Sequence, residues 1–356
     1  MKLMTVIGAR PQFIKSAAVS RVIRTFSEIN EVIVHTGQHF DFNMSDVFFE
    51  EMDIPAPTYN LDIHGLSHGA MTGQMLEKVE SVISKEKPDY VLVYGDTDST
   101  LAGALAAVKL QVPIAHVEAG LRSYNMNMPE EINRVITDRI SSLLFCPTKN
   151  AIDNLKKEGF DNFKCKIIKS GDVMQDAMLF YSNYSSKKST IVSKLGFNEF
   201  AVCTIHRAEN TDNSKRLKNI ISALVEIDKE VKVVLPVHPR TKKRLKELSI
   251  DTKDLTMIDP VGYFDMIELL KHCSIVLTDS GGLQKEAFFF GKPCVTLRDE
   301  TEWIELIEKG YNVLAGSSKE TVLSSYKKMI KSVIPNDLSL YGGGEASLNI
   351  VTSLLK

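Results

Sequence analysis

Short apolar runs rich in Val, Ile and Leu alternate along this chain with longer runs in which apolar residues recur at helical spacing. The short runs have the length of strands, and each is followed by a helix-length segment. Strands that are apolar on both faces and separated by helices are typical of parallel sheets covered by helices on both sides. The sequence therefore predicts a doubly wound α/β protein. The expected strands are residues 3–7, 31–35, 90–94, 114–117, 201–205, 231–237, 255–258, 275–278 and 294–297.

The strand–helix pattern runs through the chain twice. At 356 residues the chain is too long for one ordinary core, and a second series of strands begins near Phe200. Between the two series, residues 181–190 are polar and lack apolar periodicity, so we expect a surface connection there. We therefore expect two domains, residues 1–169 and 170–356.

Composition and charge narrow the class of protein. The net charge of -2 gives no general attraction to nucleic acid or to an anionic membrane. The five cysteines are scattered and never spaced C-x-x-C, which argues against a disulfide framework or a zinc knuckle. No apolar stretch reaches the roughly 18 residues of a membrane span, and no signal peptide precedes the first strand. We expect a cytoplasmic protein with reduced thiols.

Charged residues or glycines follow nearly every expected strand. In doubly wound sheets, ligands bind at the carboxyl ends of the strands. A domain with only a structural role has no reason to repeat this pattern, so we expect an active-site cleft between the two domains. The strand-end segments are 8–10, 36–39, 95–98, 116–122, 206–207, 238–240, 279–282 and 298–300.

The segment Thr278–Glu286 is the most informative of these strand ends. A Ser280-Gly281-Gly282 turn exposes backbone N–H groups at a helix N-terminus, where they can bind a phosphate because no Cβ blocks the approach. Glu286 lies about one turn into the same helix, where a carboxylate can bind the two ribose hydroxyls. This predicts a pocket for a nucleoside diphosphate. The alternative is a plain glycine turn between strand and helix.

Several common chemistries lack their motifs. Gly8-Ala9-Arg10 is not G-x-G-x-x-G, and no acidic residue ends the second strand, which disfavours a bound dinucleotide. There is no P-loop and no G-x-S-x-G. The histidine pairs 35/39 and 64/68 are four residues apart but not part of H-E-x-x-H, so we expect no metal. No cofactor is expected.

Three carboxylates and several cations remain as candidates for catalysis. Asp96, Glu118 and Glu130 suit removal and return of a proton beside a sugar ring. Cations near a diphosphate would stabilise the charge that grows as it departs. For each carboxylate alone, capping of a helix is the competing interpretation. The candidate cations are Arg10, Lys15, Arg122, His206, Arg207 and Arg298, and His238 also follows a strand.

Six motifs, in this order and spacing, resemble the non-hydrolysing UDP-N-acetylglucosamine 2-epimerases. They are Gly-Ala-Arg-Pro-Gln-Phe-Ile-Lys (8–15), Tyr-Gly-Asp-Thr-Asp-Ser-Thr (94–100), His-Val-Glu-Ala-Gly-Leu-Arg (116–122), Pro-Glu-Glu-Ile-Asn-Arg (129–134), Pro-Val-His-Pro (236–239) and Thr-Asp-Ser-Gly-Gly-Leu-Gln-Lys-Glu (278–286). The resemblance implies two Rossmann-like domains in the GT-B arrangement, a homodimer, and a cofactor-free elimination and re-addition of UDP at a UDP-sugar. We also expect the C-terminal helix to pack back on the first domain.

The resemblance also implies roles for single residues. Asp96, Glu118 and Glu130 fall on the family's acid/base carboxylates, and His206 on its histidine near the diphosphate. Phosphate contacts are implied for Arg10, Ser280, Gly281 and Gly282, and a ribose contact for Glu286. We expect Lys15, Arg122, Arg207, His238 and Arg298 to bind the substrate or its UDP part. Which carboxylate removes the C2 proton is left open.

Departures from the commonest family pattern point to one branch. Residues 64–69 are His-Gly-Leu-Ser-His-Gly, without the arginine of the second, activating UDP-GlcNAc site. Together with Met-Pro-Glu-Glu-Ile-Asn-Arg and Arg-Asp-Glu-Thr-Glu-Trp, this looks like the branch acting on UDP-2,3-diacetamido-2,3-dideoxy-glucuronate for surface polysaccharides. A uronate needs an extra cation near C6, which Arg122, His64 or His68 could supply.

Four alternatives are carried forward. An epimerase acting on UDP-GlcNAc itself has the same motifs. A GT-B glycosyltransferase uses the same nucleotide pocket, and fold alone does not separate it from an epimerase. It usually needs one base, whereas three carboxylates converge here. A hydrolysing epimerase lets water add to the glycal, and a non-catalytic sensor of nucleotide sugars needs no carboxylate cluster.

Overall fold

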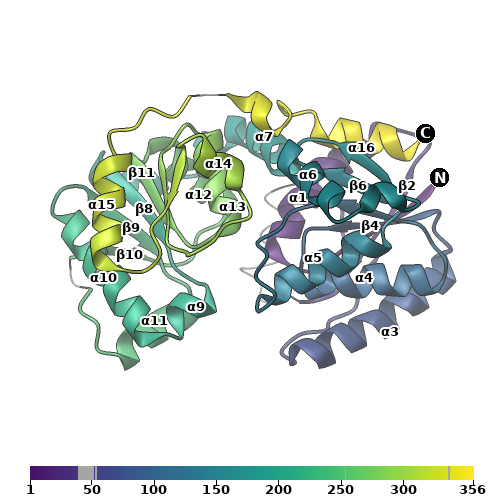
Figure 1. Ribbon diagram of the computed structural model, residues 1–356, viewed down its shortest axis with the longest axis horizontal. Helices are drawn as coiled ribbons and strands as arrows, with labels where there is room; N and C mark the ends of the chain where they lie inside the picture. Colours follow the sequence, from purple (N-terminus) through teal and green to yellow (C-terminus); the bar gives the residue numbers. More distant parts are fainter. Residues whose placement is uncertain (39–51, 53, 253, 336) are drawn as a thin grey trace. The chain divides into compact units, whose positions relative to one another are not determined.

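The computed structural model describes residues 1–38, 52, 54–252, 254–335 and 337–356. It divides the chain into two compact units (Figure 1). The first contains Met1–Phe180 and Leu338–Lys356, and the second contains Tyr181–Asp337. Each unit is an α/β structure built on its own parallel sheet.

The first unit contains a seven-stranded sheet of order β3-β2-β1-β4-β5-β6-β7, with every neighbouring pair parallel. Its strands are β1 Lys2–Ile7, β2 Asn30–His35, β3 Tyr59–Asn60, β4 Tyr90–Tyr94, β5 Ile114–Val117, β6 Leu143–Cys146 and β7 Lys166–Lys169. Its helices are α1 Arg10–Ile23, α3 His68–Glu86, α4 Asp98–Lys109, α5 Pro129–Ile140, α6 Lys149–Lys157 and α16 Ala346–Leu354, with short 3-10 turns at Phe160–Asn162 and Leu338–Tyr341.

Small residues let α4 approach the sheet of the first unit closely. Ala102, Ala106 and Ala107 are fully buried. A Cβ added at Gly103 would lie 3.1 Å from a methyl group of Val6, tighter than most real contacts. The Ala-rich sequence of this helix therefore fixes its distance from the strands, and with it the position of the loop that joins β4 to α4.

The second unit contains a six-stranded parallel sheet of order β10-β9-β8-β11-β12-β13. Its strands are β8 Phe200–Thr204, β9 Lys232–Pro236, β10 Thr256–Ile258, β11 Ile275–Thr278, β12 Cys294–Thr296 and β13 Asn312–Leu314. Its helices are α8 Ile191–Leu195, α9 Ala208–Thr211, α10 Ser214–Asp228, α11 Pro239–Glu247, α12 Tyr263–His272, α13 Gly281–Phe289, α14 Ile304–Glu308 and α15 Lys319–Met329.

The prediction of parallel α/β architecture is confirmed, and all nine expected strands are present with ends shifted by a few residues at most. Strands β3, β6, β7 and β13 were not anticipated. Where we expected a surface connection at 181–190, the chain continues the helix α7 Val173–Lys188. Its exposed residues explain the polar sequence, while buried Ser185 donates a hydrogen bond of 2.6 Å to Glu268 on α12.

The helix α16 belongs to the first unit and lies beside α1 (Figure 1). Its first turn is held by Asp176, whose carboxylate accepts hydrogen bonds from the backbone N–H groups of Ala346 (3.2 Å) and Ser347 (2.6 Å). Asn349 donates a further bond of 3.1 Å to the carbonyl of Ser170. In the described part of the chain, no helix is both long and apolar enough to cross a membrane.

Candidate active site

The turn after β1 is braced by a buried glutamine. The Gln12 side-chain oxygen accepts hydrogen bonds from the backbone N–H groups of Gly8 (2.8 Å) and Ala9 (3.0 Å). Its amide nitrogen donates to the carbonyl of Tyr94 at 3.0 Å, at the end of β4. A glutamate could not make this last bond, since an ionised carboxylate only accepts. The Gln12 side chain therefore ties the ends of β1 and β4 together beside Arg10, which begins α1.

Two of the candidate residues meet over the glycine that follows β4. Lys15 is 8% exposed and forms an ion pair with Glu118. A Cβ added at Gly95 would lie 3.0 Å from the Lys15 ammonium and 3.3 Å from a Glu118 carboxylate oxygen. Gly95 also has a positive φ of 63°. Only glycine combines that backbone conformation with so close an ion pair.

Glu118 follows β5 with a positive φ of 73°, an unusual conformation for a residue with a side chain. Backbone N–H groups of both Glu118 and Ala119 donate to the carbonyl of Phe145, each at 3.1 Å. These bonds to the end of β6 hold the unfavourable conformation in place. Strained residues of this kind cluster at functional sites.

Asp96 is held by a single arginine. The Arg134 guanidinium, on α5, donates from Nε at 3.0 Å and also from Nη2 to the same Asp96 oxygen. From Nη1 it donates to Glu131 at 2.7 Å. The Asp96 side chain is 29% exposed, so one side of the carboxylate stays open to ligand or water.

The two glutamates at the start of α5 have different surroundings. Glu131 is 1% exposed, and besides Arg134 it accepts bonds from Ser123 and from the backbone N–H of Tyr124. Glu130, the candidate for catalysis, is partly exposed in the first helical turn. Helix phase thus turns one glutamate inward to support the loop and leaves the other accessible.

Arg122 lies in a buried ion network, a placement that its position at a strand end did not indicate. It is 2% exposed, and it donates to Asp138 at 2.7 Å and twice to Glu158 at 2.7 Å. Asp138 is fully buried and also accepts a bond from His116. The N–H donors of Arg122 are therefore bonded to protein carboxylates rather than open to a ligand.

In the second unit, Asp279 organises the segment after β8. It is fully buried and accepts hydrogen bonds of 3.1 Å from the backbone N–H groups of His206 and Arg207. Its carboxylate also lies 3.2 Å from Nδ1 of His206, whose side chain is 49% exposed. Asn210 adds a fourth donor at 3.2 Å. Asp279 therefore orients His206 through its backbone N–H and Nδ1, and Nε2 is the ring nitrogen that does not face Asp279.

The Ser280-Gly281-Gly282 segment forms the N-terminus of α13, as predicted. Ser280 is the N-cap, and its hydroxyl accepts a bond from the backbone N–H of Leu283 at 3.4 Å. Gly281 and Gly282 both have ordinary negative φ values. Among the described residues, no atom lies within 4 Å of a Cβ added at Gly282, and those near Gly281 are at 3.8 Å or beyond. Neither backbone conformation nor protein packing requires glycine here, and the two glycines leave the start of α13 open.

The other candidate residues of the second unit differ in their exposure and in the groups that they contact. An Arg207 guanidinium nitrogen is 3.8 Å from the Cβ position of Gly281, and Glu286 is 7% exposed on α13 itself. His238 is the N-cap of α11, where its Nδ1 accepts a bond of 3.2 Å from the backbone N–H of Arg240. Arg298 is fully buried and donates two bonds of 3.0 Å to Glu302.

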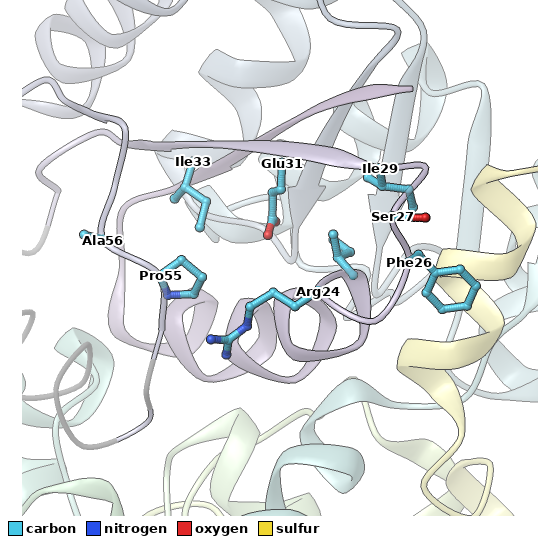
Figure 2. Close-up of a pocket in the computed structure, with 9 residues that line it drawn as sticks. Arg24, Phe26, Ser27, Ile29, Glu31, Ile33, Pro55 and Ala56 are labelled. Atoms are coloured by element: carbon cyan, nitrogen blue, oxygen red, sulfur yellow. The ribbon is translucent and has the colours of Figure 1, made fainter.

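A cavity of about 380 Å³ lies elsewhere in the first unit (Figure 2). Ile33 and Glu31 of β2 line it from the sheet, and Arg24 and Pro55 lie opposite. It opens beside the first half of β2, whereas the candidate carboxylates follow the carboxyl ends of their strands, and it contains none of the predicted site residues.

Within the described residues, no group of three or more His, Cys, Asp or Glu side chains is arranged to hold a metal ion. Of the histidine pairs, His39 lies outside the described residues. His64 lies 3.5 Å from Asp62, and His68 lies 2.9 Å from Asp98.

Comparison with known proteins gives consistent results along the whole chain. The sequence profile of a family described as UDP-N-acetylglucosamine 2-epimerase matches residues 21–355. The chain is 57% identical over 357 residues to UDP-2,3-diacetamido-2,3-dideoxy-D-glucuronate 2-epimerase of Pseudomonas aeruginosa, covering 100% of both chains. It is 43% identical to UDP-N-acetylglucosamine 2-epimerase of Methanocaldococcus jannaschii, covering 99% of each.

Solved structures agree with this relationship. The crystal structure of the Methanocaldococcus jannaschii enzyme in complex with UDP-GlcNAc and UDP has a TM-score of 0.94 at 43% identity, covering 100% of this chain and 99% of the other. The Neisseria meningitidis enzyme bound to UDP-GlcNAc has a TM-score of 0.90 at 32% identity, covering both chains completely. The expected fold of two parallel-sheet α/β domains is thereby confirmed, as is the resemblance carried by the six motifs. The chain belongs to the UDP-N-acetylglucosamine 2-epimerase family.

Proposed function

We propose that this protein is a non-hydrolysing isomerase that converts UDP-2,3-diacetamido-2,3-dideoxy-glucuronate to its manno epimer, for surface polysaccharide synthesis. The observation that carries the choice of sugar is the 57% identity, over the full length of both chains, to a relative named for that substrate. More distant relatives, at 43% identity, are named for UDP-N-acetylglucosamine, which makes that sugar the second candidate.

The proposed reaction takes place at the carboxylates of the first unit. A carboxylate removes the proton from C2 while the bond between C1 and the diphosphate oxygen breaks, and UDP leaves with the bonding electron pair. The resulting glycal then receives UDP again at C1 and a proton at the opposite face of C2. Asp96, Glu118 and Glu130 are the proposed acid/base groups, because each follows a strand or opens a helix on the same edge of the sheet.

The Lys15–Glu118 ion pair supports this proposal. The buried ammonium beside Glu118 stabilises the ionised carboxylate, and the low exposure of both groups strengthens the interaction. A base that is fixed in place before substrate binds loses little freedom in the transition state. The strained Glu118 backbone fits the same role.

UDP is proposed to bind to the second unit. The open N-terminus of α13 offers backbone N–H groups and a favourable helix dipole to a phosphate. Arg207 lies beside Gly281, and His206 is oriented by Asp279, so both are suited to stabilising the departing diphosphate. Glu286 is proposed to bind the ribose, and Arg10 and His238 are proposed further contacts.

The ion pairs of Arg122 and Arg298 favour supporting roles for these two residues. Each guanidinium already makes bidentate bonds to a glutamate, Glu158 and Glu302 respectively. Breaking such a buried pair to bind substrate would be costly. We propose that both residues hold neighbouring segments in place and that the C6 carboxylate of the sugar is bound by another group.

His68 is our proposed partner for the C6 carboxylate. It begins α3, is 72% exposed, and its Nδ1 lies 2.9 Å from Asp98. Asp98 accepts a bond of 3.2 Å from Asn133, and Asn133 donates at 2.9 Å to the carbonyl of Asp96. His68 is thus linked through Asp98 and Asn133 to the proposed catalytic Asp96. His64 lies beside Asp62, which is more exposed than Asp98.

Proton NMR in D2O tests the function directly. The enzyme is offered the diacetamido-glucuronate and UDP-GlcNAc separately, and loss of the C2 proton signal is followed together with growth of the manno product. Faster exchange with the uronate is expected. A His68→Asn variant should lose rate on the uronate selectively, and an equal loss on both sugars would exclude the proposed contact. No exchange with either sugar would remove the epimerase function and return attention to glycosyl transfer.

Assembly and location are also proposals. Ile132 and Ile136 lie one turn apart on α5 with 39% and 37% exposed surface, and Tyr124 and Met126 in the preceding loop are 65% and 58% exposed. Such an apolar surface favours the homodimer implied by the family. Light scattering of the wild type and of Ile136→Asp tests it, with a shift to monomer expected. The five cysteines are unpaired by disulfides, in keeping with a cytoplasmic protein.

A further inference from the structure

His116 lies at the centre of the first unit with both ring nitrogens engaged. It is on β5 and has no exposed surface. Its Nδ1 is 2.7 Å from a carboxylate oxygen of Asp138, on α5, and its Nε2 is 2.7 Å from the carbonyl oxygen of Gly95, at the end of β4. A carbonyl oxygen can only accept a hydrogen bond. The protonation state of the ring therefore depends on whether Asp138 can donate.

Asp138 is held in its ionised form. Its second oxygen accepts bonds from the backbone N–H of Gly120 at 3.0 Å and from Arg122 at 2.7 Å. Burial alone would raise the pKa of Asp138. The bond to His116 lowers it, and so does the Arg122 guanidinium, which is charged whatever the state of His116, so the net pKa is lowered. An ionised carboxylate has no proton to give. Both nitrogens of His116 face acceptors only, so both must donate, and the ring carries a positive charge.

Charge balance supports the same assignment. Arg122 links Asp138 to Glu158, so the network contains two carboxylates and one guanidinium before His116 is counted. A charged His116 makes the four groups neutral together, and buried charges are stable only when paired. Two thiols also lie near Asp138, those of Cys146 on β6 and of Cys165, and burial raises the pKa of both, so they are uncharged.

The group held by this imidazolium is the turn that presents Asp96. The bond to the Gly95 carbonyl fixes the peptide between Gly95 and Asp96, and the Gly95 N–H donates to Val117 at 3.0 Å. His116 is on β5, and Glu118 follows it two residues later, just after the strand ends. One side chain thereby links the two turns that present Asp96 and Glu118, and it does so through a charge-assisted bond, which is stronger than a neutral one.

We propose that His116 is a positioning residue that acts as a protonated, buried imidazolium, clamped between Asp138 and the Gly95 carbonyl so that the turns presenting Asp96 and Glu118 are held together. The importance of the two carboxylates rests on the proposed function, whereas the charge of His116 does not. A neutral ring would have to place a lone pair against an acceptor at 2.7 Å on one side. It would thus release either Gly95 or Asp138.

The charge is tested on the wild-type protein by nitrogen NMR with 15N-labelled histidine. Both nitrogens of His116 are expected at the shifts of a protonated ring near neutral pH. In Asp138→Asn the ring loses its ionised partner, and a shift to a neutral tautomer is expected. A neutral tautomer in the wild type near neutral pH would overturn the proposal, and this result needs no variant to fold and no activity.

Positioning is tested with His116→Gln. A glutamine amide donates from one end only, so it cannot satisfy both acceptors. A displacement of the Asp96 turn by about 1 Å should lower kcat roughly 100-fold, with the Kd for UDP unchanged because none of its proposed contacts lies on the Asp96 turn. The matched control is His272→Gln, a half-exposed histidine on α12, which should keep the full rate. Wild-type kcat in His116→Gln, or a loss confined to KM, would refute the positioning role. C2 exchange by the wild type reports separately on the proposed function.

Discussion

The adjacent glutamates at the start of α5 allow one substitution to serve as the control for the other. Glu130→Gln removes a proposed acid/base group that is partly exposed, whereas Glu131→Gln alters a buried support. If the assignment is right, the first variant should lose activity and keep its stability, and the second should lose stability. Each change replaces one carboxylate oxygen by an NH2 group, and the side chain keeps nearly the same size.

The cost of Glu131→Gln follows from its bonds. One carboxylate oxygen accepts from the backbone N–H and hydroxyl of Ser123 and from Arg134, at 3.0, 2.9 and 2.7 Å. The other accepts only from the Tyr124 N–H at 2.9 Å. The least costly amide orientation keeps the first three bonds and leaves the Tyr124 N–H facing another donor. An unsatisfied buried donor costs about 1–3 kcal/mol, and Tyr124, with a positive φ of 59°, depends on such support.

For a unit of about 200 residues, this loss of stability should lower Tm by about 2–12 °C. Glu130→Gln should change stability by no more than about 0.5 kcal/mol and lower kcat by about 10²- to 10⁴-fold, the usual contribution of a general acid or base. Calorimetry measures the first effect, and C2 proton exchange in D2O measures the second. Full activity in Glu130→Gln, or an unchanged Tm in Glu131→Gln, would show that the two roles have been wrongly assigned.

Three further predictions concern single side chains. Glu286→Ala should weaken UDP binding about 10- to 140-fold by titration calorimetry, because a charged hydrogen bond of about 1.5–3 kcal/mol is lost; an unchanged Kd would exclude the ribose contact. Gly282→Val should leave Tm unchanged, since the space around an added Cβ is open, yet weaken UDP binding, and equal UDP affinity would exclude a phosphate at this turn. Glu31→Gln should raise Tm at neutral pH, because burial raises the pKa of Glu31 and the ionised form is costly in the folded protein. Its Thr5 and Ser20 bonds both go to one oxygen, which the amide retains. The sign of the pH dependence is fixed by the raised pKa: the cost is absent in acid and appears as the pH rises through the folded-state pKa. The gap in Tm should therefore close on acidification, and a gap that widens would contradict the argument.

The sequence predicted most of the apolar strands, although β6, which is apolar throughout, was missed. β1, β4 and β11 consist mostly of Val, Ile, Leu and other apolar residues and were located closely. β7 was missed because its two isoleucines are flanked by lysines, and β13 because it is short and begins with an asparagine, a residue depleted in strands. Short or polar-ended strands take their structure from neighbouring strands, which a local pattern does not contain.

For the candidate site, the sequence located the strand ends but not the side chains that hold them. Asp138 lies 16 residues from Arg122 and 22 from His116, and no periodicity relates such positions. Arg122 was expected to bind substrate because its charge follows a strand, yet burial and pairing are set by α5 and α6, which fold over it. The supporting role of Asp279 could have been predicted from the sequence. An acidic residue between a buried strand and a Ser-Gly-Gly turn has few neighbours other than the backbone of the adjacent loop.

The return of residues 338–356 to the first unit has a consequence for biosynthesis. The chain is synthesised from its N-terminus at about 5–20 residues per second. The second unit, Tyr181–Asp337, is therefore complete before residues 338–356, which finish the first unit, are made. Until then α1 lacks its neighbour α16, and Asp176 lacks the two N–H donors of Ala346 and Ser347. The first unit to begin synthesis is thus the last to close, and premature release of the nascent chain would yield a folded second unit attached to an open first one.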